Sequence, residues 1–361
     1  MNINLLLQQA ISAGASDLHL TVGVSPVLRV NGNLIHMDAP TLTWDDTENL
    51  ARQLLPDNKQ AVLEELGEVD VSYSHGDLGF FRVNVYRQRG AIGIALRLLN
   101  TEVASIKTLE LPEAVTIMAR RNRGLILVTG PTGSGKSTTL AAMTKLINSE
   151  KERHIVTLED PIEYIHKNQK CIITQREIGR DSLSFPNALR AALRQDPDVI
   201  VVGEMRDLET ISIAVTAGET GHLVISTLHT MDAAQTVERI IDVFPPNQQH
   251  QVRVQLANSL VGVLSQRLLK RLDGTGRIAA VEALICTPAV RNLIREGKIH
   301  QLSSIMQTGA KQGMHTFDKH LQSLIVQGRI GPEEALEHAS DQENMRLYLK
   351  KHSGYIDREA L

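Results

Sequence analysis

The stretch GPTGSGKSTTLAAM, residues 130–143, follows the apolar segment LILV and leads into a run of residues that favour a helix. Its first eight residues fit the pattern G-x-x-x-x-G-K-[ST] in full. Glycines in this pattern let backbone N–H groups approach phosphate oxygens, and the start of the helix adds a partial positive charge. A strand, a glycine-rich loop and a helix in this order predict an α/β domain that binds a nucleoside triphosphate.

Within this loop each residue type has an expected role. Lys136 is expected to reach the β- and γ-phosphates of ATP, and the hydroxyl of Ser137 to ligate Mg²⁺. A glycine-rich turn that binds nothing is the alternative, and the strand before and the helix after the loop argue against it. The predicted nucleotide-binding residues are Gly130, Pro131, Thr132, Gly133, Ser134, Gly135, Lys136, Ser137 and Thr138.

Three further apolar segments end in polar side chains: IVTLEDPIEY at 155–164, DVIVVGEMRD at 198–207 and GHLVISTLHT at 221–230. Continuous apolar strands that alternate with helices predict a parallel sheet covered on both faces. Ligands of such sheets bind at the carboxyl ends of the strands. The polar residues that end these segments are therefore candidates for the nucleotide site.

Carboxylates at a strand end can orient an attacking water or complete the shell of a magnesium ion. Glu163 follows one strand and Glu204 another, where Glu204 is the candidate for contact with magnesium or water. A surface ion pair is the alternative, and it suits Arg206 better than Glu204. His229 follows a third strand, where it can contact the γ-phosphate or transfer a proton. His222 lies seven residues earlier, a spacing unlike that of a two-histidine metal site on a helix.

The first hundred residues predict a separate α+β domain. Short alternating strands, two helices and a hairpin signal at Asn31-Gly32 indicate an antiparallel sheet covered on one face, as in PAS-like domains. We expect a PAS-like domain over 1–100, a linker over 101–113 and the nucleotide-binding domain over 114–361. From residue 248 onward the chain is expected to be mostly helical, with an amphipathic helix over 284–298.

Composition limits the classes of partner. The net charge is −3 and aromatic residues make up 3% of the 361 residues, which argues against nucleic acid as a ligand. The two cysteines form no CxxC pair, so we expect no zinc site. We expect no signal peptide, because the first residues show neither a positive n-region nor a cleavage site, and no transmembrane helix, because no apolar run of about 18 residues is present. We therefore expect a cytoplasmic protein that reaches any membrane machine through a partner.

The order of these motifs resembles that of the secretion ATPase superfamily. GPTGSGKST is similar to its Walker A motif, TLEDPIEY to its Asp box, VIVVGEMRD to its atypical Walker B motif and GHLVISTLHT to its His box. Within the superfamily, AVRNLIRE at 289–296, MQTGAKQGMHTFDKHL, GASDLHL and RVNVYRQRG resemble the type IV pilus retraction ATPases, the twitching-motility PilT family. The resemblance covers nearly the whole chain.

The resemblance implies a homohexamer of subunits with a PAS-like and a RecA-like domain, bound to an inner-membrane platform protein at the cytoplasmic face. It implies ATP- and Mg²⁺-dependent pilus depolymerisation. Glu163 would be the general base, Glu204 the Walker B acid and His229 a γ-phosphate contact, while helix 289–296 would couple hydrolysis to retraction. A neighbour would supply Arg82 and Arg97, which the match does not separate from Arg87 and Arg89.

Other functions remain open at this stage. An accessory retraction ATPase shares most motifs, whereas assembly and type II secretion ATPases are longer at the N-terminus and often contain a tetracysteine zinc module. A small-molecule kinase needs a lid and an acceptor pocket, and a DNA translocase needs a basic surface. A scaffold that has lost catalysis is disfavoured by the intact Lys136, Glu163 and Glu204.

Overall fold

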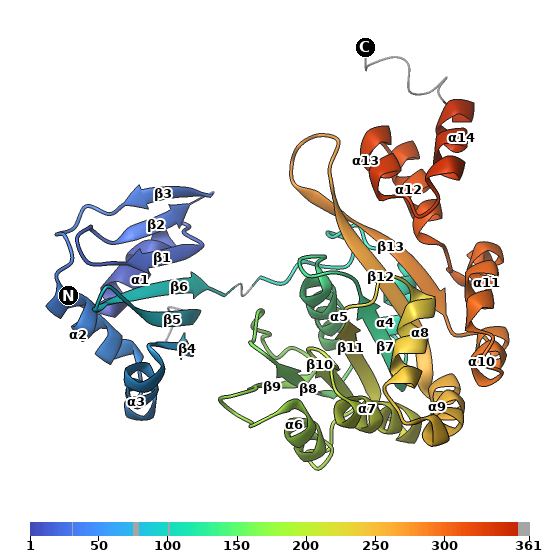
Figure 1. Ribbon diagram of the computed structural model, residues 1–361, viewed down its shortest axis with the longest axis horizontal. Coiled ribbons are helices and arrows are strands. Elements are labelled where there is room, and N and C mark those ends of the chain that lie inside the picture. Colours follow the sequence, from blue (N-terminus) through green and yellow to red (C-terminus); the bar gives the residue numbers. More distant parts are fainter. Residues whose placement is uncertain (31, 75–78, 100–101, 353–361) are drawn as a thin grey trace. The chain divides into compact units, whose positions relative to one another are not determined.

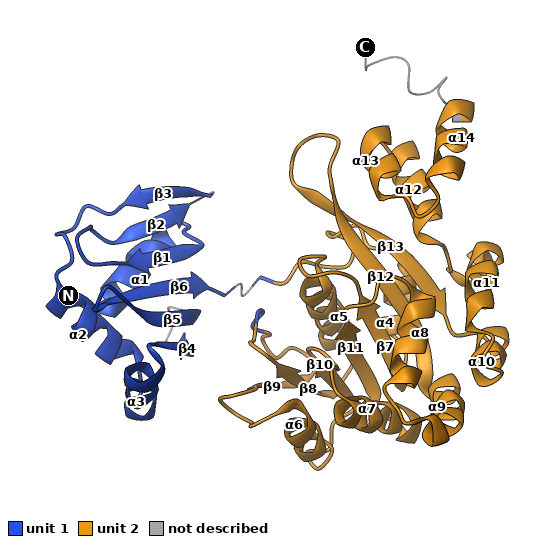
Figure 2. Cartoon of the chain, in the orientation of Figure 1, with its two compact units in different colours: residues 1–102, 163–165 blue, residues 103–162, 166–361 orange. Residues whose placement is uncertain are grey.

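The computed structural model describes residues 1–30, 32–74, 79–99 and 102–352. The chain divides into two compact units (Figure 2): unit 1 is residues 1–102 with 163–165, and unit 2 is residues 103–162 with 166–361. Over the described residues, no helix has the length and apolar character needed to cross a membrane.

Unit 1 is an antiparallel sheet with helices packed on its apolar face (Figure 1). Its elements are α1 (Ile3–Ser12), β1 (Asp17–Leu20), β2 (Val27–Val30), β3 (Asn33–His36), α2 (Trp44–Leu54), α3 (Asp57–Leu66), β4 (Glu68–Ser74), β5 (Phe80–Gln88) and β6 (Ala91–Leu98). The strand order is β3-β2-β1-β6-β5-β4. Alternation along the strands sets the two faces: Phe81, Val83 and Val85 of β5 join the core with Leu6 of α1 and Leu50 of α2.

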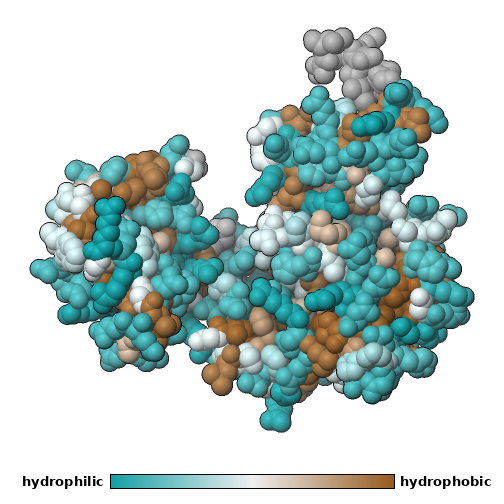
Figure 3. Space-filling model, viewed as in Figure 1, coloured by the Kyte–Doolittle hydropathy of each residue, from teal (hydrophilic) through white to brown (hydrophobic). Residues whose placement is uncertain are grey.

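The β2–β3 pair has the register of the predicted hairpin, with Val30 opposite Asn33; Asn31 lies outside the described residues. β3 is one of the two edge strands of this sheet, and its side chains are exposed. In Figure 3, apolar residues gather over this edge, where Leu34 and Ile35 are among the exposed hydrophobic residues. The α+β organisation predicted for the N-terminal part is therefore confirmed.

Unit 2 is a mainly parallel sheet between helices. Its elements are α4 (Glu113–Ala119), β7 (Gly124–Thr129), α5 (Lys136–Glu150), β8 (His154–Glu159), β9 (Ile172–Glu177), α6 (Phe185–Ala192), β10 (Val199–Val202), α7 (Leu208–Thr220), β11 (Leu223–Leu228), α8 (Ala233–Asp242), α9 (Pro246–Ser259), β12 (Leu260–Lys270), β13 (Arg277–Ile285), α10 (Pro288–Arg295), η2 (Ile299–Gln301), α11 (Leu302–Thr308), η3 (Ala310–Gln312), α12 (Phe317–Val326), α13 (Pro332–His338) and α14 (Gln342–His352).

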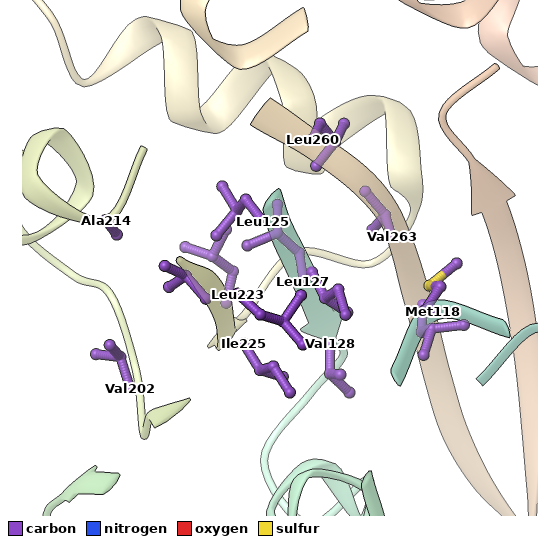
Figure 4. Packing of buried hydrophobic residues seen from close by; sticks show 14 of the residues in the cluster. Met118, Leu125, Leu127, Val128, Val202, Ala214, Leu223, Ile225, Leu260 and Val263 are labelled. Carbon is purple, nitrogen blue, oxygen red and sulfur yellow. The ribbon is translucent and has the colours of Figure 1, made fainter. Parts of the chain in front are cut away.

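The strand order in unit 2 is β13-β12-β7-β11-β10-β8-β9, and only the pair of β12 with β13 is antiparallel among these described strands. Every residue of β7, β10 and β11 is buried. Figure 4 shows how their apolar side chains pack, with Leu125 and Leu127 of β7 near Leu223 and Ile225 of β11. Burial along the whole length of a strand means that both faces of the sheet are covered, as predicted.

The mostly helical prediction from residue 248 onward is wrong for residues 260–285. These residues form β12 and β13, a long antiparallel pair at the edge of the sheet. RIAAVEALI contains helix-favouring residues, but eight of its nine residues are buried in the sheet, and this burial outweighs local propensity. The helix predicted over 284–298 is α10, which begins at Pro288 behind the capping side chain of Thr287.

The predicted domain boundaries at 1–100, 101–113 and 114–361 stay predictions. Residues 100 and 101, at the expected junction, lie outside the described residues, as do residues 353–361. Ile106, within the expected linker, is buried in the core of unit 2. Arg267 of β12 stacks over the ring of Phe317 of α12, 4.5 Å from its centroid, so the sheet and the C-terminal helices are in direct contact.

Candidate nucleotide-binding site

The loop between β7 and α5 has the backbone geometry that its glycines allow. Gly130, Gly133 and Gly135 have φ values of 141°, 77° and 85°, in the region that L side chains rarely adopt. A Cβ on Gly130 would lie 2.2 Å from the carbonyl oxygen of Gln266 and would not fit. The glycine spacing thus reflects both backbone conformation and close packing.

Lys136 begins α5 and is 9% exposed. Its Nζ donates hydrogen bonds to the carbonyl oxygens of Gly130 and Pro131, each 2.9 Å away. These bonds hold the ammonium group within the curve of the loop, next to backbone N–H groups at the start of a helix. Such an arrangement suits a phosphate group, because cation, N–H donors and helix dipole all favour an anion.

Glu204 and His229, predicted from different segments, are brought together. β11 pairs with β7 so that Leu228 lies opposite Thr129, and β10 lies on the other side of β11. The carboxyl ends of these parallel strands lie at the same end of the sheet as the phosphate-binding loop. There the Nε2 of His229 lies 3.4 Å from Oε2 of Glu204.

The other oxygen of Glu204 is paired with Arg206, at 2.8 Å from its Nε. The side chain of Arg206 is 74% exposed and that of Glu204 only 17%, so the carboxylate is fixed and the arginine can move away into water. The segment after β10 that contains Gly203 and Glu204 is held by the hydroxyl of Thr227, which donates to the carbonyl oxygen of Gly203 at 2.6 Å. The surface ion pair expected for Arg206 as an alternative to a functional role is therefore present, and its partner is Glu204.

The oxygen donors at this edge fit a magnesium ion. Mg²⁺ binds oxygen ligands, mostly one or two protein groups together with substrate phosphates. Ser137 offers a hydroxyl in the first turn of α5, and Glu204 offers a carboxylate that already attracts two nitrogen donors. Both are the residues predicted from the sequence as metal ligands.

Other predicted residues make different contacts or belong to unit 1. His222 precedes β11 at the opposite end of the strand, and its Nδ1 lies 3.2 Å from the carbonyl oxygen of Ala217, a structural contact. Glu163 is exposed in the segment Glu163–Ile165, which groups with unit 1. Its role as general base stays a prediction.

Arg82 and Arg97 are opposite each other on β5 and β6 of unit 1. Each also has a carboxylate near it in its own sheet: Arg97 Nε lies 2.8 Å from Asp17 Oδ1, and Arg82 Nε lies 3.9 Å from Asp70 Oδ1. The arginine side chains are 68% and 46% exposed. Arg82 and Asp70 are both exposed, and such a pair contributes at most about 1 kcal/mol. Asp17 is only 12% exposed, but the guanidinium of Arg97 stays in contact with water, so either arginine can exchange its partner.

One residue of the loop region was missed by the sequence analysis. Gln266 on β12 donates from Nε2 to the carbonyl oxygen of Ser134 and accepts from the hydroxyl of Thr139. Its local signal is the polar run Ser265-Gln266-Arg267 within an otherwise apolar strand. That run indicates buried polar contacts, although it cannot say with which segment.

The glycine-rich loop that joins β7 to α5 at the carboxyl end of a parallel sheet defines a P-loop nucleotide-binding protein. The model of the family "Type II/IV secretion system protein" matches residues 1–346, and the chain belongs to this family. The type IV pilus retraction ATPase PilT of Pseudomonas aeruginosa is 47% identical over 344 residues, which are 95% of this chain and 100% of that protein.

A twitching motility protein of Neisseria gonorrhoeae is 48% identical over 321 residues, 89% of this chain and 86% of the relative. The crystal structure of the pilus retraction motor PilT with bound ADP superimposes with a TM-score of 0.89 at 49% identity, covering 96% of this chain and 99% of that one. The family and the retraction ATPase branch recognised from the motifs are thus confirmed.

Proposed function

We propose that this protein is an ATPase that drives type IV pilus retraction and thereby twitching motility. The observation that supports this most is the buried Lys136 inside a glycine loop, at the same sheet edge as the Glu204–His229 pair. A kinase would require an acceptor pocket as well, whereas a motor needs only water and a moving partner. The relatives of nearly equal length are named for retraction and twitching motility.

We propose a role for each of these residues. Lys136 would stabilise the charge that develops on the transferred phosphoryl group, and Ser137 and Glu204 would hold a Mg²⁺ ion, which would neutralise phosphate charge. His229, oriented by its contact with Glu204, senses the γ-phosphate. Glu163 is the proposed general base, and its carboxylate would accept a proton from the attacking water.

The proposed assembly is a homohexamer at the cytoplasmic face of the inner membrane, bound to the platform protein of the pilus machine. In a ring, Arg82 or Arg97 of one subunit can complete the nucleotide site of the next, where such an arginine is worth about 10³ to 10⁵ in rate. The weak pairs that these arginines make within their own sheet are compatible with this exchange. Mixing Arg97→Ala subunits with Lys136→Ala subunits should therefore restore part of the ATPase activity that each lacks alone.

The proposal is tested by comparing Lys136→Ala with Lys151→Ala. Lys151 lies at the other end of α5 and also donates to two backbone carbonyl oxygens, those of Arg120 and Arg121 at 2.7 and 2.9 Å. We expect Lys136→Ala to abolish Mg²⁺-dependent ATP hydrolysis and pilus retraction while Lys151→Ala keeps both. Hydrolysis by Lys136→Ala near the wild-type rate would refute the site, and hydrolysis that persists after chelation of Mg²⁺ would refute the metal.

A further inference from the structure

Gln266 connects β12 to the phosphate-binding loop and to the first turn of α5. Its Nε2 donates to the carbonyl oxygen of Ser134 at 2.7 Å, and its Oε1 accepts from the hydroxyl of Thr139 at 2.9 Å. Exposed fractions of Ser134, Thr139 and Gln266 are 3%, 2% and 2%. We propose that Gln266 is a positioning residue that holds the loop in the conformation that binds phosphate.

The bond to Ser134 fixes the orientation of one peptide group in the loop. The peptide between Ser134 and Gly135 is trans, so its C=O and its N–H point in opposite directions. Gln266 holds the carbonyl oxygen towards β12, which directs the N–H of Gly135 away from the strand. This N–H lies at the start of α5, where backbone donors and the helix dipole attract an anion.

The bond to Thr139 fixes the orientation of the glutamine itself. Thr139 lies in the first turn of α5 and its backbone N–H already bonds to Gly135. Because its hydroxyl donates to Oε1, the Nε2 end of the Gln266 amide must face Ser134. One buried amide is thus held by the helix and in turn holds the loop.

Two P-loop glycines pack against the same residue. A Cβ on Gly130 would lie 2.2 Å from the carbonyl oxygen of Gln266, and a Cβ on Gly135 would lie 3.3 Å from its Nε2. The loop therefore lies directly on Gln266, with no room for a larger residue at Gly130. Rigid support of this kind raises affinity because less freedom is lost when the ligand binds.

This inference rests on the proposed nucleotide site, and its test uses binding as well as hydrolysis. The probe is fluorescent methylanthraniloyl-ADP, measured at equilibrium with the full chain. Gln266→Met keeps the length of the side chain and removes both hydrogen bonds. We expect its affinity to fall about tenfold, because the loop then has to be ordered when the nucleotide binds. ATP should show the same loss, because both nucleotides carry the phosphates that loop N–H groups bind.

Steady-state kinetics separate positioning from a loss of folded protein. A positioning role predicts a KM for ATP about tenfold higher in Gln266→Met, with kcat within about threefold of wild type. Asn148→Leu is the matched control, because this buried amide of α5 also bridges backbone groups, accepting from Gln169 and Cys171 and donating to Lys167. It should lower thermal stability without changing KM.

The Thr139 pair provides a second, milder test if Gln266→Met does not fold. Thr139→Val removes the hydroxyl that orients Gln266 and should weaken binding, whereas Thr139→Ser keeps the hydroxyl and should restore wild-type affinity. Wild-type affinity in Gln266→Met or in Thr139→Val would overturn the inference. A wild-type chain that binds neither nucleotide would instead overturn the proposed function.

Discussion

Glu282 of β13 is a buried carboxylate, 7% exposed, that joins two helices. It accepts a hydrogen bond from the N–H of Ala233, at 2.8 Å, and another from the N–H of Phe317. These residues begin α8 and α12, so one side chain satisfies a donor at the start of each helix. The cap residues Asp232 and Thr316 bond to donors further along the two helices.

Glu282→Leu should therefore destabilise unit 2 strongly. Leaving a buried donor without its acceptor costs about 1–3 kcal/mol, and the substitution leaves two buried N–H groups without this acceptor. We expect a loss of about 3–5 kcal/mol, which lowers the melting temperature of a domain of this size by roughly 10 °C. Glu238→Leu, at an exposed position of α8, is the control and should change stability by less than about 0.5 kcal/mol.

Glu282→Gln separates the role of the acceptor oxygen from that of the charge. Burial raises the pKa of Glu282 above its ordinary 4.5, so the folded chain holds this proton more tightly than the unfolded chain does. Its contribution to stability is full below pH 4.5 and is lost as the pH rises through the raised pKa. The stability of Glu282→Gln relative to wild type should therefore increase as the pH rises.

Thermal unfolding followed by fluorescence, at several pH values, measures all three variants. The reasoning fails if Glu282→Leu lowers the melting temperature by less than about 2 °C, because two unsatisfied donors must cost more than that. It also fails if Glu282→Gln is as unstable as Glu282→Leu, since the amide keeps an acceptor oxygen.

Further predictions concern the loop, the catalytic edge and the pH response. Gly130→Ala should abolish nucleotide binding, measured with methylanthraniloyl-ADP, because its Cβ would meet a carbonyl oxygen at 2.2 Å. Glu204→Gln should keep ATP binding and slow hydrolysis by at least about a hundredfold; a collapse of ATP affinity would show that Glu204 serves binding rather than the chemical step. Burial lowers the pKa of His320 from 6.5 to about 4, so its contribution to stability is present above pH 6.5 and is lost as the pH falls towards 4. His320→Asn, which retains an acceptor for the N–H of Val281, should flatten this part of the pH profile of the melting temperature.

Much of the nucleotide-binding core could be predicted, because its signals are local. The loop pattern specifies backbone conformation, and fully apolar strands specify a sheet buried on both faces. The position of Glu204 and His229 at one end of the sheet followed from one general rule, that the carboxyl ends of parallel strands meet there; their direct contact did not. Each of these inferences needs only the residues of one segment and the topology of the fold.

Contacts between distant segments could not be predicted in this way. Gln266 lies about 130 residues from its partners in the loop, and nothing in its own strand specifies them. The amphipathic pattern over 284–298 gave no sign that the guanidinium of Arg291 donates to the carbonyl oxygens of Ala257 and Asn258 at the end of α9. A variant that tests whether α10 couples hydrolysis to retraction should therefore replace Arg295 alone. Replacing Arg291 would also remove the hydrogen bonds that cap the end of α9.

The contacts that β12 makes with both the phosphate-binding loop and the C-terminal helices have a mechanical consequence. Successive side chains of a strand point to opposite faces, so Gln266 contacts the nucleotide loop and Arg267 contacts Phe317 of the C-terminal helices. Backbone pairing holds Gln266 and Arg267 opposite Val281 and Ala280 of β13, while the pairing of β12 to β7 ends at Ser265, one residue earlier. A movement of the loop would therefore reach the C-terminal helices through one residue of β12, which is about 3.3 Å of extended backbone. Force generated at the phosphates would be transmitted without a hinge, over the length of one residue.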